Sequence, residues 1–195
     1  MTTNHNEKDN YKAAPIPENL KQNERIAMIT GSGAEDLEFF YPYYRFNEAG
    51  YCVDMITEKG GSFDCKAGLG LHNSMAIDRV NPDHYALLYL PGGHAPSYLK
   101  DNKKVLDFVT KFAESNKPIS AICHDPQILA AAGLIKGKKI AAWPEMKEEI
   151  EKAGAIFADE ALQEDGQFIT ARRPGDLHRH LWGTLAALEK SLRPL

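Results

Sequence analysis

The chain has 195 residues, of which 43% are hydrophobic and 26% are charged. This balance is typical of a globular protein and excludes collagen-like, low-complexity and fully disordered chains. Its net charge is -4, whereas a protein that binds nucleic acid through the phosphates carries a basic excess, so we expect no nucleic-acid partner. No stretch reaches the roughly 18 consecutive apolar residues of a membrane span, and the first residues lack the apolar core of a secretory signal. We therefore expect a cytoplasmic protein with no membrane partner.

Two regions differ in character. Residues 1–24 are polar and are expected to form a loosely ordered arm, either draped on a neighbouring subunit or simply disordered. Residues 25–195 are long enough to bury a sizeable core and are expected to form a single domain. The three cysteines are sparse and include no CxxC pair, which argues against a disulfide framework or a zinc site. No metal and no cofactor are expected.

Strand and helix signals alternate along the domain. A short apolar strand at 25–30 leads into a helix over 35–49, which is followed by a strand at 51–57 and a β-hairpin or loop excursion at 60–80. A strongly apolar strand at 85–90 precedes an amphipathic helix at 103–115, and a strand at 118–122 runs directly into a helix at 126–132. Further strands are predicted at 139–142, 156–157 and 168–170, with helices at 145–153 and 176–192.

This alternation predicts a mostly parallel sheet with helices on both faces. In such sheets the functional site lies beyond the carboxyl ends of the strands. The turns at Gly31–Glu38, Pro91–Pro96 and Cys123–Asp125 should therefore converge.

The segment PISAICHDPQILAAAG delivers Cys123 from a buried strand to a tight turn at which the next helix begins. Nucleophile elbows have this strand–nucleophile–helix arrangement. A cysteine at a helix N-terminus faces unsatisfied N–H groups, so a lowered pKa is expected if Cys123 is functional. The alternative is a small buried core cysteine.

Within this segment, AICHDPQ resembles the AICHGPQ nucleophile segment of the ThiJ/PfpI superfamily, and most of all that of the PfpI-type intracellular proteases. The likeness extends to GAEDLEFFYPYYRFNEAG, LPGGHAP, AAWPEMKEEIEKAGA and ITARRPGDL, and covers about residues 25–192. It implies a flavodoxin-like α/β sandwich, also described as class I glutamine amidotransferase-like. It also implies a homo-oligomer, a dimer or a hexamer.

The resemblance assigns roles residue by residue. Cys123 falls on the nucleophile, and Glu38 on a carboxyl that hydrogen-bonds the sulfur; burial would keep that carboxyl protonated. Gly93 and the N–H of His124 fall on the oxyanion hole, and His124 also on the general base. Without the resemblance, Glu38 would be interpreted as a solvated helix charge and the Gly92–Gly93 pair as a plain turn.

Two positions depart from the family pattern. PfpI-like proteases take the acid that orients the base from a neighbouring subunit, and that position is Ser97 in this chain. Asp125 stands where the family has glycine, and we expect it either to cap the next helix or to replace the missing acid. Proteolysis is therefore the weakest part of the resemblance.

Three further side chains are candidates for the pocket or for an intersubunit contact. His94 lies in the glycine loop. Trp143 is expected either to line the pocket mouth or simply to pack. Arg172 is expected to bind an anion or a neighbour's carboxylate, or to stabilise its own turn.

The resemblance thus implies a cysteine-dependent enzyme that acts on small carbonyl compounds or glycated proteins, as a deglycase, a glyoxalase without added cofactor or a weak peptidase. The alternative is a non-enzymatic stress chaperone or redox sensor in which Cys123 oxidises reversibly.

Overall fold

The computed structural model describes residues 24–193, so the predicted arm lies outside the described residues except for its last one. The strands of the described chain are β1 (Arg25–Ile29), β2 (Cys52–Thr57), β3 (Gly61–Asp64), β4 (Gly70–Ala76), β5 (Tyr85–Leu90), β6 (Ile119–Ile122), β7 (Lys139–Ala141), β8 (Ile156–Ala158), β9 (Gln163–Asp165) and β10 (Phe168–Ala171). The α-helices are α1 (Asp36–Glu48), α2 (Pro96–Leu99), α3 (Lys103–Glu114), α4 (Pro126–Ala131), α5 (Lys147–Lys152) and α6 (Leu177–Leu192).

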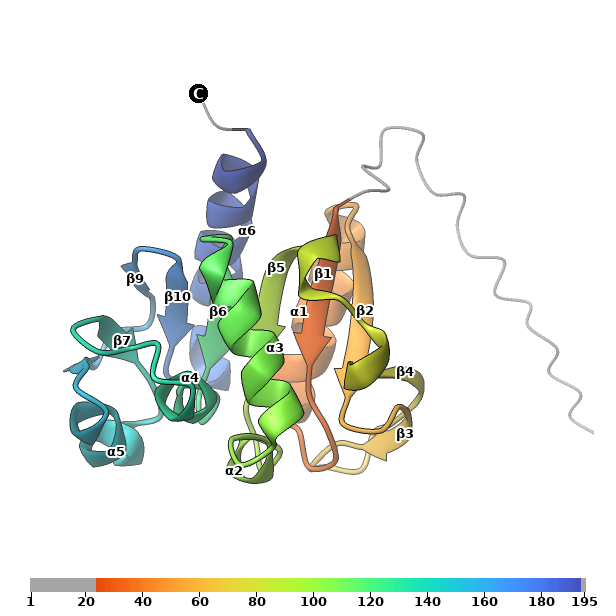
Figure 1. The fold of residues 1–195 in the computed structure, drawn as a ribbon, viewed down its shortest axis with the longest axis horizontal. Helices are drawn as coiled ribbons and strands as arrows, with labels where there is room; N and C mark the ends of the chain where they lie inside the picture. Colours follow the sequence, from red (N-terminus) through yellow and green to blue (C-terminus); the bar gives the residue numbers. More distant parts are fainter. Residues whose placement is uncertain (1–23, 194–195) are drawn as a thin grey trace, which may run out of the picture.

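Eight of these strands form one central sheet in the order β3-β4-β2-β1-β5-β6-β10-β9. The pairs from β4 to β10 are parallel, and only the edge strands β3 and β9 run antiparallel to their neighbours. The arrowheads of the parallel strands point toward the lower edge of the view in Figure 1, which makes this edge the carboxyl end of the sheet. The predicted parallel sheet is confirmed.

Helices cover both faces of the sheet, α3 and α4 in front and α1 and α6 behind (Figure 1). The amphipathic helix α3 presents five residues to the front core, namely Val105, Phe108, Val109, Phe112 and Ala113. The rear core is formed mainly by α1 and α6, through Phe39, Phe46, Leu181 and Leu188. Two apolar layers around a sheet define the flavodoxin-like α/β sandwich that the family resemblance implies.

The structure differs from the prediction at four small elements. Strands β7 and β8 pair with each other as a separate two-stranded sheet. Strand β9 and the one-turn helix α2 were not predicted. Both are very short, and the polar QED sequence of β9 carries no apolar alternation, so pattern analysis has little to detect there.

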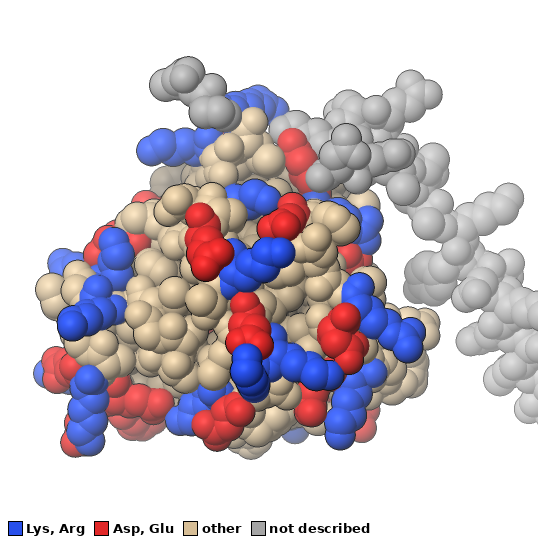
Figure 2. Space-filling view, in the orientation of Figure 1, with Lys and Arg blue, Asp and Glu red and all other residues tan. Residues whose placement is uncertain are grey.

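Acidic and basic side chains are intermixed on the face of the molecule shown in Figure 2. On α3, for example, Lys103 pairs with Asp107, Lys104 with Asp78 and Lys111 with Asp83. Among the described residues, no helix combines the length and the apolar character that crossing a bilayer requires.

Candidate active site

The three turns singled out in the sequence meet at the carboxyl edge of the sheet. The backbone N–H of Glu35 donates to the carbonyl of Gly92 at 3.0 Å, and the N–H of His94 donates to the carbonyl of Gly33 at 2.7 Å. An antiparallel bridge joins Ala34 to Gly93. The turn after β1 is thus fixed directly to the turn after β5, and the predicted convergence is confirmed.

Cys123 occupies the turn between β6 and α4 in a left-handed backbone conformation, with a φ of 63°. Non-glycine residues adopt this conformation at a cost of about 1–2 kcal/mol, and such strain is concentrated at functional sites. Its N–H donates to the carbonyl of Ala171 at 3.1 Å, and its carbonyl accepts from the N–H of Trp143 at 2.8 Å. Neighbouring segments on both sides therefore hold Cys123 in this geometry. Its side chain is 4% exposed.

Polar groups surround the Cys123 sulfur. Sγ lies 3.0 Å from Nδ1 of His124. The Glu38 carboxyl, from the first turn of α1, and the backbone N–H groups of Gly93 and His124 also interact with the thiol. The predicted nucleophile, base, carboxyl and oxyanion-hole donors therefore share one site.

The glycine loop approaches so closely that side chains are excluded from it. A Cβ at position 92 would lie 2.5 Å from Oε2 of Glu38 and 2.7 Å from Cβ of Cys123. Gly93 has a φ of 96°, and a Cβ there would lie 2.3 Å from the backbone N of Glu35. The pair is more than a plain turn, because its lack of side chains allows the carboxyl and the thiol to approach each other.

Glu38 is a buried acid rather than a solvated helix charge. Its side chain is 0% exposed, and desolvation, reinforced by the charge of Glu35, raises its pKa to about 8. Glu38 is therefore mainly protonated at neutral pH and has a proton available for the sulfur or for a reacting oxygen.

The pKa of Cys123 is raised, so the lowered pKa expected from the sequence is wrong. Burial raises the pKa of the thiol, and so does the Glu38 charge, while the N–H groups of Gly93 and His124 act in the opposite direction. Helix α4 spans only Pro126–Ala131, so its dipole is too short to offset desolvation. The sulfur is accordingly a thiol at rest, with a base in contact.

That base, His124, is held neutral. Desolvation, together with the charges of His94 and Lys66, lowers the pKa of His124, against the opposing charge of Glu145. Its ring stacks on the Trp143 indole, with centroids 5.7 Å apart. The indole N–H in turn donates to the Glu145 carboxylate. A neutral imidazole can accept the thiol proton at Nδ1 when the N–H lies on the other ring nitrogen.

Asp125 performs neither of its two expected roles. Its side chain makes no capping hydrogen bond to α4, and both carboxyl oxygens are buried without a hydrogen-bond partner among the described residues. Burial, followed by the charge of Glu38, raises its pKa well above the usual value. Both expectations fail because, among the described residues, the buried carboxyl accepts a hydrogen bond neither from an N–H of α4 nor from the His124 ring.

Two of the other candidates lie beside the site and one does not. The glycine loop brings His94 close to the site, and Ser97 is exposed nearby on α2 with its Oγ donating to the carbonyl of His94 at 2.7 Å. Arg172 instead pairs with Asp159 at 2.7 Å and with Asp176 at 2.9 Å. Its guanidinium stabilises the turn between β10 and α6, which is one of its expected roles, and anion binding by Arg172 stays a prediction.

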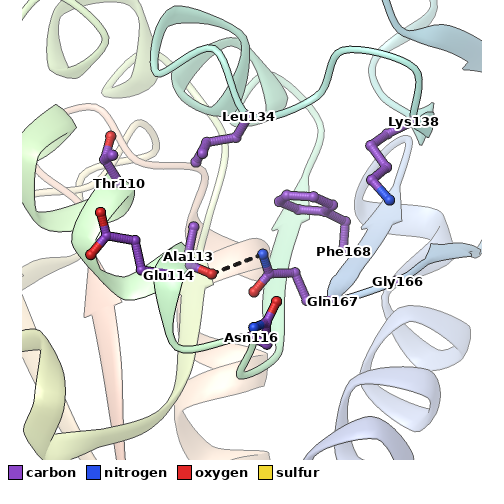
Figure 3. A pocket seen from close by; sticks show the side chains of 9 residues that line it. All are labelled: Thr110, Ala113, Glu114, Asn116, Leu134, Lys138, Gly166, Gln167 and Phe168. Carbon is purple, nitrogen blue, oxygen red and sulfur yellow. Dashed lines mark hydrogen bonds between the residues drawn. The ribbon is translucent and has the colours of Figure 1, made fainter.

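A cavity of about 400 Å³ opens at the opposite edge of the sheet (Figure 3). Gln167, just before β10, faces the end of α3 and donates from Nε2 to the carbonyl of Ala113 at 3.1 Å. None of the predicted site residues lines this cavity.

Two charged residues near the site, Lys66 and Glu145, are not among the candidates that the sequence predicts. The charges of both act on His124. Glu145 follows β7 in the chain, so the rule that sites lie beyond strand ends could have indicated it. Lys66 lies in the hairpin connection between β3 and β4, where no local pattern points toward the site.

The fold and this geometry define a flavodoxin-like α/β protein with a cysteine-centred site at a strand-to-helix turn. The DJ-1/PfpI family model matches residues 24–185, and the chain belongs to this family.

Several known proteins are similar to the chain. Deglycase TK1284 of Thermococcus kodakarensis is 36% identical over 154 residues, which cover 79% of this chain and 93% of the relative. Protein/nucleic acid deglycase 2 of Escherichia coli is 36% identical over 157 residues (79% and 91%), and the putative cysteine protease YraA of Bacillus subtilis is 33% identical over 155 residues (79% and 92%).

Solved structures agree in fold. The two-domain protein from Anabaena variabilis, with DJ-1/ThiJ/PfpI-like and ferritin-like domains, superposes with a TM-score of 0.83 at 29% identity, covering 85% of this chain and 48% of that protein. DJ-1beta of Drosophila melanogaster superposes with a TM-score of 0.79 at 22% identity (87% and 95%) and supports the fold alone.

Proposed function

We propose that this DJ-1/PfpI protein is a cysteine-dependent enzyme that acts on small reactive carbonyl compounds or on their glycated protein adducts. The observation that carries the proposal is the strained Cys123, whose sulfur lies 3.0 Å from His124 Nδ1 beside a buried acid and two backbone N–H donors. Names of relatives, two deglycases and a putative cysteine protease, are consistent with this class of enzyme.

In the first step, Sγ attacks the aldehyde carbon and the thiol proton passes to Nδ1 of His124. A carbon–sulfur bond forms as the carbonyl π bond breaks, and its electron pair moves to oxygen. The N–H groups of Gly93 and His124 stabilise the developing oxyanion. Proton return to that oxygen, from Glu38 or from the imidazolium, yields a neutral hemithioacetal.

For a 2-oxoaldehyde, His124 then moves the proton from C1 to C2 through an enediol, which converts the hemithioacetal into a thioester. Hydrolysis by one water releases a 2-hydroxy acid and restores the thiol. For a glycated adduct, Sγ attacks the carbinol carbon, the carbon–nitrogen bond breaks, and the amine leaves with the thiol proton, which His124 carries to it. The hemithioacetal that results then undergoes the same proton shift and the same hydrolysis. Every step uses only the substrate, water and these side chains.

A turnover screen tests the proposal, with methylglyoxal, glyoxal, a glycated peptide and casein as substrates for the wild type and Cys123→Ser. We expect turnover of the small carbonyl compounds or the glycated peptide by the wild type, and its loss in Cys123→Ser. The matched control is Cys52→Ser, a partly exposed cysteine outside the site. Absence of turnover with every substrate would favour the chaperone or redox-sensor alternative.

A further inference from the structure

A groove of about 350 Å³ lies between the two helices behind the sheet, α1 and α6. Its α1 wall includes Tyr41 and Ala49, and its α6 wall includes Leu181, Trp182 and Leu185. We call it the rear groove. None of the predicted site residues lines it, so the proposed chemistry of Cys123 does not account for it.

Two aromatic side chains of the rear groove remain open to solvent. The Trp182 side chain is 75% exposed and that of Tyr41 is 43% exposed, although the neighbouring Leu181 and Leu185 are buried. Large apolar side chains that are exposed together in one place mark a surface that another segment covers. The rear groove therefore has the character of a binding surface for a peptide.

The described part of the chain begins close to one end of the rear groove. Arg25, the first residue of β1, pairs with Cys52 on the adjacent strand β2, about 4.8 Å away. Cys52 follows Ala49, which lines the groove, by three residues, and three residues span at most about 11 Å. The chain thus enters the fold within roughly 16 Å of the groove.

The segment that precedes the described residues is long enough to fill the rear groove. The groove runs along α6 from His178 to Glu189, a length of about 16 Å at the rise of an α-helix. Pro17 lies eight residues before Arg25, a reach of about 25 Å in a polyproline II conformation, and Ala13 lies twelve residues before it, a reach of about 37 Å. Residues 13–17 can therefore extend over the full length of the groove.

The chemistry of residues 13–17 matches that of the groove. Within the polar stretch 1–23, these residues read AAPIP and carry no charge. Proline-rich segments bind to aromatic-lined grooves because their extended conformation is already favoured before binding, so little conformational entropy is lost. The family model begins at residue 24, so this segment lies outside the part of the chain that the family model matches.

The dimensions of the groove favour a segment of the same chain over a second copy. Helices pack about 10 Å apart, so a groove about 16 Å long offers roughly 160 Å², whereas a stable interface buries about 800 Å² on each partner. A segment tethered by a short linker is present at an effective concentration in the millimolar range, so a small contact area is sufficient to hold it.

We propose that residues 13–17 bind in the rear groove of their own chain, in an extended conformation, with Pro15, Ile16 and Pro17 packed against Tyr41 and Trp182. This interaction is independent of the proposed enzyme function.

Hydroxyl-radical oxidation of the full chain, read by peptide mass spectrometry at Tyr41 and Trp182, tests the proposal. Ile16→Asp places a charge against the apolar groove and should raise both oxidation rates roughly threefold, since a weakly held tethered segment covers the groove for most of the time. Tyr98 on α2 has nearly the same exposed fraction as Tyr41, 42%, and serves as the internal reference. Its rate should not change.

Two further variants are matched controls. Ile16→Leu keeps the apolar side chain and should retain the slow oxidation of Tyr41 and Trp182. Asn6→Asp adds the same charge outside residues 13–17 and should leave all rates as in the wild type. Unchanged rates at Tyr41 and Trp182 in Ile16→Asp, or an equal rise at Tyr98, would overturn the proposal.

A mixing experiment shows whether the segment binds its own chain. Isotope-labelled wild type and unlabelled Ile16→Asp are unfolded together in urea, refolded and oxidised, and the two isotopic forms of each peptide are measured separately. We expect slow oxidation of Tyr41 and Trp182 in the labelled chain and fast oxidation in the unlabelled chain. A single intermediate rate for both forms would mean that the segment crosses to a second copy, which contradicts the proposal.

Discussion

At the scale of single residues, Cys123 combines backbone strain with a buried side chain. Strain of this kind persists only when the surroundings impose it, and here the hydrogen bonds to Ala171 and Trp143 do so. The conformation matters for chemistry because it directs the sulfur toward the Gly93 loop and Glu38.

Removing the side chain should reveal the strain. At ordinary positions glycine is less stable than alanine by roughly 0.5–1 kcal/mol, but glycine adopts positive φ freely. We therefore expect Cys123→Gly to have a free energy of unfolding higher than that of Cys123→Ala by about 1 kcal/mol. Urea denaturation of the two inactive variants measures this difference. The usual order, alanine above glycine, would show that position 123 relaxes when the thiol is absent.

Glu38 should set the alkaline limit of activity. With its pKa raised to about 8, Glu38 loses its proton as the pH rises through that value, and the Cys123 thiol then faces a negative charge. On the acid side, activity should fall as His124, whose pKa lies below 6.5, becomes protonated. A bell-shaped profile of kcat/KM is expected.

Replacing Glu38 with Gln removes the titrating proton. Activity should fall about tenfold or more, as is typical for loss of a general acid, and the alkaline limb of the profile should disappear. The fold should survive, because an acid with a raised pKa destabilises the native state once the pH exceeds its unfolded pKa. A lowered melting temperature at pH 8 would instead indicate a structural role for Glu38.

At the scale of elements, His180 anchors α6 to the sheet. Its Nε2 lies 2.8 Å from Ser120 Oγ on β6 and 3.2 Å from the carbonyl of Ile169 on β10, while its Nδ1 is buried without a partner among the described residues. Because the Ile169 carbonyl can only accept, the N–H belongs on Nε2 and Nδ1 remains bare. Desolvation lowers the pKa of His180 to about 4.

This lowered pKa predicts acid sensitivity. The unfolded chain binds a proton at His180 near pH 6.5 and the folded chain only near pH 4, so stability is lost as the pH falls through this window. The loss should be about 3 kcal/mol. His180→Gln should abolish the part of the pH dependence that arises there, as measured by denaturant unfolding at pH 7 and pH 4.5. An identical slope in His178→Gln and His180→Gln would exclude this assignment.

Asp36 links a helix start to the loop at 65–69. Asp36→Ala should release the amides of Ala67 and Leu69, cost roughly 1–3 kcal/mol and expose the buried thiol of Cys65. Faster hydrogen exchange at these amides and faster labelling of Cys65 are the expected signals. Glu48→Ala, at the exposed end of the same helix, serves as the control. If Cys65 labels equally slowly in both variants, the loop does not depend on this anchor.

The sequence predicted the long elements well because their periodicity is strong. The apolar run YALLYL became the fully buried β5, and the apolar face of 103–115 became the core face of α3. Charged residues that come together only through tertiary contacts leave no pattern in the local sequence. Neither the ion pairs of Arg172 nor the position of Lys66 could be predicted from its neighbours in the chain. The raised pKa of Cys123 was missed because burial of the turn is a property of the assembled site.

At the scale of the whole molecule, assembly of subunits stays a prediction. If the site is completed by a second copy, Ser97 of that copy should approach His124, where a hydroxyl stabilises an imidazolium less than a carboxylate does. Peptidase activity should therefore be weak. Ser97→Glu should raise peptide hydrolysis, measured with a casein-type substrate, and should leave the oligomer intact by light scattering. Vigorous Cys123-dependent proteolysis by the wild type would contradict this expectation.

The site is assembled from segments far apart in the chain: Glu38 follows β1, Gly93 follows β5 and Cys123 follows β6. Glu38 and Gly93 precede Cys123 in the chain, but Trp143 and Ala171, which hold its backbone, follow it. During synthesis Cys123 should therefore remain an ordinary thiol until these later segments have folded. The rate at which this sulfur is alkylated should therefore report how far folding has proceeded. During refolding, the Cys123 environment should appear only with the last native contacts, and a site-directed alkylation pulse would record that moment without any spectroscopic label.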